Sequence, residues 1–149
     1  MIIDPDEHPD RHRDPATAFA DARRRLRDEV LTDERVRRVY VMIGAPGSGK
    51  STHAKELRRD DFRADERAYV DGCHADAPER RRLARQIRDA GKIPIAVFMR
   101  TPLAECLRRN NQREPPRRVP PSTVRRMSFE LEKRPPRKVE GWHEVIEVA

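Results

Sequence analysis

Gly44-Ala45-Pro46-Gly47-Ser48-Gly49-Lys50-Ser51, followed by Thr52, fits the pattern G-x-x-x-x-G-K-[ST]. Residues 39–43 before it are apolar and rich in β-branched side chains, which predicts a buried strand, and residues 51–57 predict a helix start. Glycines let a backbone approach phosphate oxygens at positive φ, and the N–H groups of a helix N-terminus bind anions. A strand, a glycine-rich loop and a helix in this order predict a phosphate-binding P-loop.

The loop also predicts the donor side of a phosphoryl-transfer reaction. Lys50 is expected to reach the β- and γ-phosphates of ATP, and the Ser51 hydroxyl is expected to ligate Mg²⁺. The remaining nucleotide contacts are assigned to the rest of the loop: Gly44, Ala45, Pro46, Gly47, Ser48, Gly49 and Thr52. ATP and Mg²⁺ are therefore the expected cofactors.

The composition indicates one domain and makes an anionic partner plausible. The chain has 149 residues, of which 36% are hydrophobic and 40% are charged, so we expect a lean core. The net charge of +7 comes almost entirely from arginine, since lysine occurs only at positions 50, 55, 92, 133 and 138. Arginine binds phosphate bidentately, which favours a nucleic acid partner, although an arginine-rich composition can equally reflect coding bias.

Cysteine usage and hydropathy indicate a soluble protein in a reducing compartment. Cys73 and Cys106 are the only cysteines and lie far apart, so they form neither a disulfide framework nor a zinc pattern. The sequence shows no signal peptide and no apolar run of membrane-spanning length. We expect a cytoplasmic protein, in the host cytoplasm if the gene belongs to a phage.

The order of local patterns predicts an α/β domain. We expect a P-loop NTPase three-layer αβα sandwich with a short, mostly parallel sheet. Residues 1–13 are rich in Asp, His, Pro and Arg and predict a flexible N-terminal arm, and residues 14–149 predict a single P-loop domain. An added N-terminal helix should begin at Asp14-Pro15 and place Phe19 and Ala22 on its buried face.

Further strands and helices alternate after the P-loop helix. Strands are expected over residues 68–71, 94–99 and 142–148. A helix beginning at Ala77 should turn Leu83 and Ile87 inward and Arg80, with the neighbouring arginines, outward, and Gly91 should end it. An Arg-rich helical lid is expected over about residues 103–131, with a proline-rich connection between its two helices.

Four further motifs follow the P-loop in order. They are Arg59-Asp60-Asp61-Phe62-Arg63, Val70-Asp71-Gly72 with Pro78-Glu79-Arg80-Arg81, Arg109-Asn110-Asn111-Gln112-Arg113 with Val119-Pro120, and Glu140-Gly141-Trp142. Together with the P-loop, this set resembles the P-loop kinases of the polynucleotide-kinase type, whose relatives include zeta toxins and small-molecule kinases. The resemblance runs from about Val39 to the C-terminus and implies a kinase domain. The sequence departs from the family in the short connection between Lys50 and Asp60, where the family usually has a strand.

The resemblance implies roles for several charged residues. Asp60 would be the general base that orients the acceptor hydroxyl and takes its proton. Asp71 is the alternative by position, as base or as Mg²⁺-side carboxylate, because it ends a predicted strand at the carboxyl edge of the sheet. Arg113 matches the family's lid arginine, and Arg109 lies one helical turn earlier. Both are expected to bind ATP and to counter charge on the transferred phosphoryl group.

The sequence leaves open which molecule accepts the phosphoryl group. Arg63, by resemblance, and His74, which lies just past Asp71, are expected to contact substrate, and by resemblance residues 137–141 and the lid would hold the adenine. The leading hypothesis is ATP-dependent transfer to a hydroxyl of a nucleic acid, either a 5′-OH end or a hydroxymethylated base in DNA. The alternatives are a small-molecule kinase acting on a nucleoside, sugar or antibiotic, and a non-catalytic, nucleotide-gated binding module.

Overall fold

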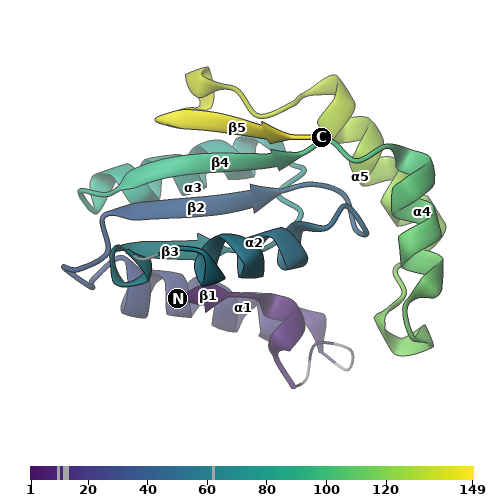
Figure 1. Cartoon of the computed structure of the whole chain (residues 1–149), viewed down its shortest axis with the longest axis horizontal. Helices are drawn as coiled ribbons and strands as arrows, with labels where there is room; N and C mark the ends of the chain where they lie inside the picture. Colours follow the sequence, from purple (N-terminus) through teal and green to yellow (C-terminus); the bar gives the residue numbers. More distant parts are fainter. Residues whose placement is uncertain (10, 12–13, 62) are drawn as a thin grey trace.

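Strands that alternate with helices build a parallel sheet in the structure, a computed structural model that describes residues 1–9, 11, 14–61 and 63–149 (Figure 1). The described strands form one five-stranded sheet in the order β1-β3-β2-β4-β5, and every neighbouring pair is parallel. The strands are β1 (Ile2–Ile3), β2 (Arg38–Ile43), β3 (Arg67–Val70), β4 (Ile93–Met99) and β5 (Glu144–Val148). The expected α/β class is confirmed, and the described sheet is parallel throughout.

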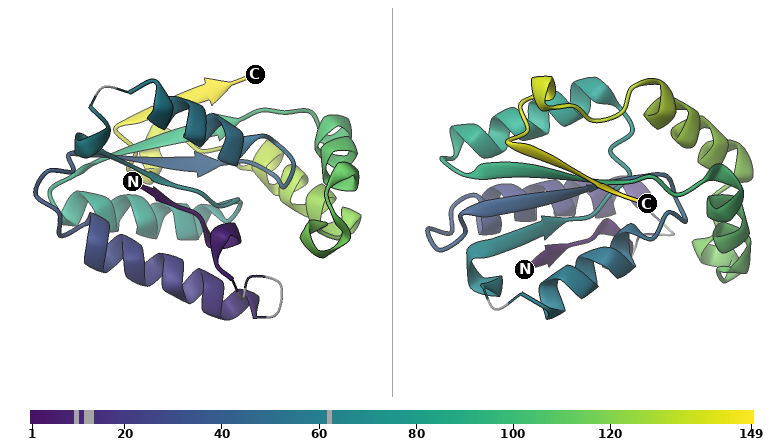
Figure 2. Two further views of the ribbon diagram at one scale, coloured as in Figure 1. Left: turned by 60° about the horizontal axis from the view of Figure 1, so that its bottom comes forward. Right: turned by 45° about the horizontal axis from the view of Figure 1, so that its top comes forward.

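Helices cover both faces of this sheet (Figure 2). The α-helices are α1 (Pro15–Arg25), α2 (Lys50–Arg59), α3 (Ala77–Asp89), α4 (Leu103–Gln112) and α5 (Pro121–Lys133). Short helical turns are η1 (Pro5–Glu7), the π-helical η2 (Leu26–Val30), η3 (Ala64–Glu66), η4 (Pro115–Arg117) and η5 (Lys138–Glu140). The α2 helix lies on one face of the sheet, α1 and α3 lie on the other, and α4 and α5 stand beyond the carboxyl ends of the strands. No helix of the described residues is both long and apolar enough to span a membrane.

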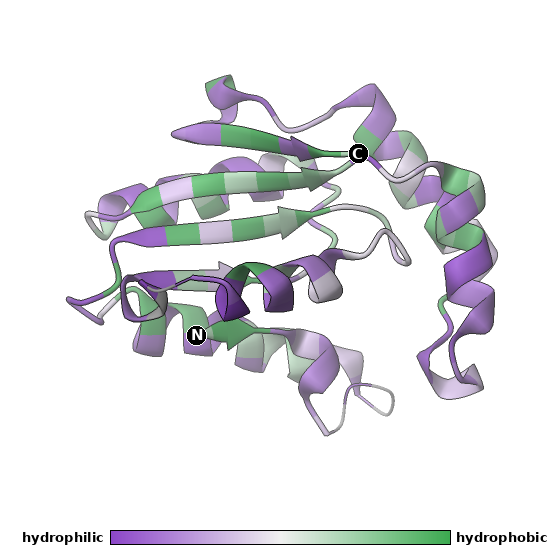
Figure 3. Cartoon of the chain, in the orientation of Figure 1, coloured by the Kyte–Doolittle hydropathy of each residue, from purple (hydrophilic) through white to green (hydrophobic). Residues whose placement is uncertain are grey.

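The core is divided by the alternation of side chains along the strands. Val41 of β2 packs on the face shared with Leu26 and with Ile87 of α3. Met42, the next residue, packs with Ala54 of α2 on the opposite face. Apolar residues therefore fill the central strands, and hydrophilic residues gather on the outer faces of the helices (Figure 3). A near-continuous apolar run is what a central parallel strand covered on both faces requires.

The N-terminal residues differ from the flexible arm predicted for residues 1–13. Ile2 and Ile3 form the edge strand β1, which pairs in parallel with Tyr69 and Val70 of β3. Ile3 is fully buried. Composition missed this strand because two apolar residues give no periodic signal, and because their partner strand comes from a distant part of the chain. Residues 10, 12 and 13 of the predicted arm lie outside the described residues.

The added helix α1 begins where the sequence predicts it. Asp14 is the N-cap and accepts a hydrogen bond from the backbone N–H of Thr17 at 3.2 Å, and Pro15 is the first helical residue. The predicted buried face is shifted by one residue at its start. Phe19 is 39% exposed, and Ala18 is buried instead.

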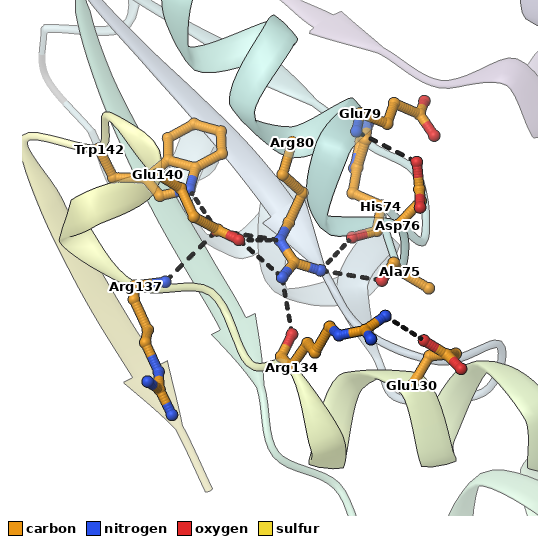
Figure 4. A network of polar contacts seen from close by, with 10 residues as sticks. All are labelled: His74, Ala75, Asp76, Glu79, Arg80, Glu130, Arg134, Arg137, Glu140 and Trp142. Carbon is orange, nitrogen blue, oxygen red and sulfur yellow. Dashed lines mark hydrogen bonds and ion pairs between the residues drawn. The ribbon is translucent and has the colours of Figure 1, made fainter.

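Arg80 is the largest departure from the predicted helix faces. The sequence places it among the outward arginines of α3, but its side chain is fully buried (Figure 4). Its guanidinium donates to both carboxylate oxygens of Glu140 at 2.8 to 3.2 Å. It also donates to three backbone carbonyls, those of His74, Ala75 and Arg134. All five N–H donors of the guanidinium are therefore satisfied inside the protein.

This network joins α3 to the last strand. Glu140 ends η5, shortly before β5, and also accepts a hydrogen bond from the indole Nε1 of Trp142 at 3.1 Å. Trp142 is itself 2% exposed and belongs to the main core. The motifs that contain Arg80 and Glu140, which lie far apart in the sequence, thus meet as a structural ion pair. The physical reason for the burial of Arg80 is this partner, which helical periodicity could not reveal.

The predicted lid corresponds to α4, η4 and α5, which form a helical hairpin beyond the carboxyl ends of the strands. Buried Asn110 closes the hairpin, since its amide donates to the Val119 carbonyl at 2.7 Å and its side-chain oxygen accepts from the Val119 N–H at 3.0 Å. Cys106 of α4 and Val124 of α5 pack together with Ala45 of the glycine-rich loop. The hairpin is therefore anchored directly on that loop.

Candidate active site

The glycine-rich loop, residues 44–49, connects β2 to α2 at the carboxyl edge of the sheet. Gly47 and Gly49 have φ angles of 82° and 94°, a left-handed backbone that glycine adopts without strain. Space is also limiting at Gly47, where a Cβ would lie 2.4 Å from the carbonyl oxygen of Cys106. Glycine is therefore required at this position both for backbone conformation and for the close contact with α4.

Hydrogen bonds hold the loop from both sides of β2. The Gly44 N–H donates to the carbonyl of Cys73, which follows β3, at 3.1 Å. The Thr101 hydroxyl, which follows β4, donates to the Ser48 carbonyl at 2.7 Å. These bonds fix the loop against the two strands that flank β2, so its curve does not depend on a ligand.

Lys50 lies inside this curve. Its side chain is largely buried, and its Nζ donates to the Ala45 carbonyl at 2.9 Å. Lys50 is also the first residue of α2, where the helix dipole is positive. An ammonium group and a helix N-terminus at the same place favour binding of an anion such as phosphate.

Ser51 and Asp71 meet at the same edge. The Ser51 Oγ donates to Asp71 Oδ2 at 2.5 Å, and the Gly72 N–H donates to Asp71 Oδ1 at 2.8 Å. Asp71 follows β3, the strand next to β2, and is 5% exposed. A hydroxyl and a carboxylate side by side are the hard oxygen ligands that Mg²⁺ accepts. They supply two ligands, so phosphate and water oxygens would complete the coordination.

His74 lies near this pair but is engaged with the fold. Its Nδ1 is 2.8 Å from the Met42 carbonyl oxygen, and its ring packs over Gly72, where a Cβ would lie 2.7 Å from Cε1. Burial lowers the pKa of His74, so the ring is neutral and donates to Met42. The contacts of His74 within the described residues therefore brace the turn after β3, and its expected contact with substrate stays a prediction.

A pocket of about 450 Å³ lies over the loop, between α2 and α4. Residues 47–49 form its floor, and Arg109 and Arg113 line the side formed by the α4–α5 hairpin. Arg109 Nε donates to Glu105 at 2.8 Å, and hydrogen bonds from Arg108 and Arg109 lower the pKa of Glu105 to about 2. Arg113 has no ion pair with another described residue. The hairpin therefore presents to the pocket one arginine that is held by Glu105 and one that has no ion pair with another described residue.

Asp60 and Arg63 are not at this site. Asp60 caps the C-terminus of α2, is exposed, and pairs with Arg59 at 2.9 Å. Since α2 has 10 residues, Asp60 lies about 15 Å along the helix from Lys50. Arg63 follows in the connection to β3, at the amino edge of the sheet. The geometry thus contradicts the predicted base role of Asp60 and substrate role of Arg63; Phe62 of the same motif lies outside the described residues.

Residues 137–141 also lie away from the pocket. Glu140 is bound to Arg80, and a Cβ at Gly141 would lie 3.3 Å from Ala84 of α3. The pocket is instead lined, near the C-terminus of the chain, by Ala149 after β5. Residues 137–141 do not line this pocket, because the segment packs on α3 before β5 begins, and their expected adenine contact stays a prediction.

Sequence reasoning missed Asp4. It follows β1 as Asp71 follows β3, and it is 9% exposed. Burial, and then the neighbouring Asp71 carboxylate, raise the pKa of Asp4 to about 6. The signal that could have found it is the order of residues 2–4, two apolar residues and then a carboxylate, which repeats the pattern of residues 69–71.

No protein-family model matches the chain, and a search of curated proteins finds no match.

Proposed function

We propose that this chain is a P-loop kinase that transfers the γ-phosphoryl group of ATP, with Mg²⁺, to a hydroxyl group of a nucleic acid. The observation that carries the proposal is the Ser51–Asp71 hydrogen bond beside Lys50 at the N-terminus of α2. In P-loop enzymes, the loop hydroxyl and a carboxylate from a neighbouring strand hold Mg²⁺, and the loop and its lysine hold the phosphates. The same residue types are brought together here.

Each side chain then has a defined task. The loop N–H groups and Lys50 would bind the β- and γ-phosphates, and Ser51 and Asp71 would hold Mg²⁺. Held there by Ser51 and Asp71, Mg²⁺ would supply positive charge that offsets the charge of the phosphates. Arg109 and Arg113 face the loop across the pocket and would counter the charge that develops on the transferred group.

Exposed arginines on the lid support a nucleic acid as acceptor. Arg117, Arg125 and Arg126 are exposed, and they form no ion pair with other described residues. Unpaired arginines attract a phosphate backbone and account for the salt dependence of nucleic acid binding. The net charge of +7 acts in the same direction.

A transfer assay with γ-labelled ATP and Mg²⁺ tests the proposal. The acceptor panel should contain DNA and RNA oligonucleotides with a 5′-OH, DNA with a hydroxymethylated base, nucleosides, sugars and antibiotics. We expect label on a nucleic acid, transfer at least about 10²-fold slower with Lys50→Ala, and unchanged transfer with the exposed-lysine control Lys138→Ala. Label found only on a nucleoside, sugar or antibiotic would show that the acceptor is a small molecule and not a nucleic acid. ATP binding without transfer would support the nucleotide-gated module instead.

A further inference from the structure

The acceptor half of the site lacks a carboxylate from the connection between α2 and β3, because Asp60 lies at the opposite edge of the sheet. The structure instead places β1 beside β3. We propose that Asp4, which follows β1, is the catalytic carboxylate that binds the acceptor hydroxyl and takes its proton. This inference rests on the proposed kinase function and names the residue that completes it.

Strand register puts Asp4 beside Asp71. Ile3 pairs with Val70, and the backbone N–H of Asp71 donates to the Ile3 carbonyl at 2.8 Å. The next residue of each strand is therefore a neighbour of the other, across the spacing of about 5 Å that separates parallel strands. Both carboxylates lie at the carboxyl edge that also carries the glycine-rich loop.

Side-chain alternation turns both carboxylates toward α2. Ile3 and Val70 point into the core on the face of α1 and α3. Successive side chains of a strand point to opposite faces, so Asp4 and Asp71 point to the face of α2. The hydrogen bond from Ser51, on α2, to Asp71 follows this direction.

An exposed ion pair shows that the segment after Asp4 lies beside α2. Glu7, at the end of η1, pairs with Lys55 at 3.5 Å, and Lys55 lies one helical turn after Ser51 on the same side of α2. The η1 turn therefore leads the chain along the side of α2 that carries Ser51. Asp4 lies at the start of this turn, next to Asp71.

The sheet order separates the donor and acceptor sides. The pocket over the loop is lined by residues that follow β4, including Thr101, Arg109 and Arg113. Asp4 comes from the other side of β2, beyond β3. Phosphoryl transfer places the attacking and leaving oxygens roughly in line across phosphorus. A nucleotide entering from the β4 side would thus present its γ-phosphate toward Ser51, with Asp4 on the side from which an acceptor attacks.

The Asp4 carboxylate has capacity to bind an acceptor. Its Oδ1 accepts from the Asp6 N–H at 2.8 Å, and no other hydrogen bond or ion pair joins it to a described residue. An asparagine would cap this turn equally well without a charge. Burial of a carboxylate without a cationic partner is unfavourable, and such groups concentrate at functional sites.

In the proposed step Asp4 accepts the proton of the acceptor hydroxyl and ADP is the leaving group. The acceptor O–H donates its hydrogen bond to Asp4 Oδ2. As the acceptor oxygen bonds to the γ-phosphorus, the bond between that phosphorus and the β–γ bridging oxygen breaks, and ADP leaves. The proton passes from the acceptor oxygen to Asp4 and then to water after the product departs.

Hydrolysis of ATP offers a test that needs no identified acceptor, since water can take the acceptor position. We expect Asp4→Asn to lower turnover at saturating ATP by about 10²- to 10⁴-fold, both with water and with the acceptor found above. The affinity for a non-hydrolysable ATP analogue, measured by calorimetry, should stay within about twofold, and the melting temperature should not fall. Asp4→Ser, which also retains a capping oxygen, should behave in the same way. Asp6→Asn, in the same turn and exposed, is the control that keeps wild-type turnover.

Turnover of Asp4→Asn within about threefold of the wild type would overturn the inference and leave the kinase proposal intact. A loss of turnover matched by a loss of analogue binding or of folding in both variants would also overturn it, because Asp4 would then be structural. A wild-type protein that binds the analogue but neither transfers nor hydrolyses would refute the proposed function, and this inference with it.

Discussion

Replacing Arg80 with alanine should destabilise the fold more than any exposed arginine substitution. The change leaves the Glu140 carboxylate, 5% exposed, without its cation. It also removes the donor from the carbonyls of His74, Ala75 and Arg134. Among the described residues, Glu140 keeps only its bonds from Trp142 Nε1 and the Arg137 N–H.

The expected magnitude follows from the burial of both partners. Breaking a buried ion pair by removing one partner costs about 3–5 kcal/mol. Three carbonyls lose a donor as well, which places Arg80→Ala at the upper end of that range. For a chain of this size, about 2–4 °C of melting temperature corresponds to each kcal/mol, so a loss near 5 kcal/mol should lower the melting temperature by about 10–20 °C.

Urea unfolding followed by tryptophan fluorescence measures this loss, because Trp142 belongs to the network and is the only tryptophan. Arg81→Ala, the next residue on α3 and exposed, is the matched control and should stay within about 0.5 kcal/mol of the wild type. The double variant Arg80→Ala/Glu140→Ala should lose less than the sum of the single losses, since it leaves no buried carboxylate unpaired. A loss below about 1 kcal/mol for Arg80→Ala would show that the buried network does not form in solution.

Three further predictions concern the site. Folding raises the pKa of Asp4 to about 6, so ionisation of its carboxylate should reduce the stability of the wild type as the pH rises from about 4 to about 6, and Asp4→Asn should be at least as stable as the wild type at pH 8. Urea unfolding of both proteins in EDTA at about pH 4 and at pH 8 tests this, and a stability difference between them that is the same at both pH values would contradict it. Gly47→Ala should lower both ATP-analogue affinity and stability by at least about 1–2 kcal/mol, since it adds a clash with Cys106 to backbone strain, whereas Gly91→Ala, with φ of 76° and open space around it, should show the strain alone. Equal losses for the two variants in calorimetry and thermal melts would refute the close contact between residue 47 and Cys106. Arg113→Ala should lower kcat about 10²- to 10³-fold while ADP affinity changes little, and near-normal kcat would remove Arg113 from the reaction.

Local patterns were sufficient to predict the glycine-rich loop and its place in the fold. The glycine-rich loop, its strand and its helix are adjacent in the sequence, so one short stretch carries all three signals. The N-cap at Asp14 and the alternation of strands and helices are equally local, and the structure confirms both. Asp71 could be placed at the carboxyl edge because it directly follows an apolar strand.

Motif order, in contrast, misplaced residues 59–63, which were expected beside the glycine-rich loop. Residues 59–63 match the family pattern, but α2 runs into them without an intervening strand, so they lie at the amino edge of the sheet. The position that a further strand would fill belongs to Ile2 and Ile3. A two-residue strand is too short to show periodicity, and only its pairing with β3 places Asp4 beside Asp71.

The sequence alone therefore determined a glycine-rich loop between a buried strand and a helix, because residues in direct succession build it. Tertiary structure decided which distant charges meet. Arg80 is buried because Glu140 reaches it from η5, and Asp4 joins the edge of the loop because β1 pairs with β3. Burial and pairing of this kind depend on contacts between segments far apart in the chain, which local propensity and spacing do not encode.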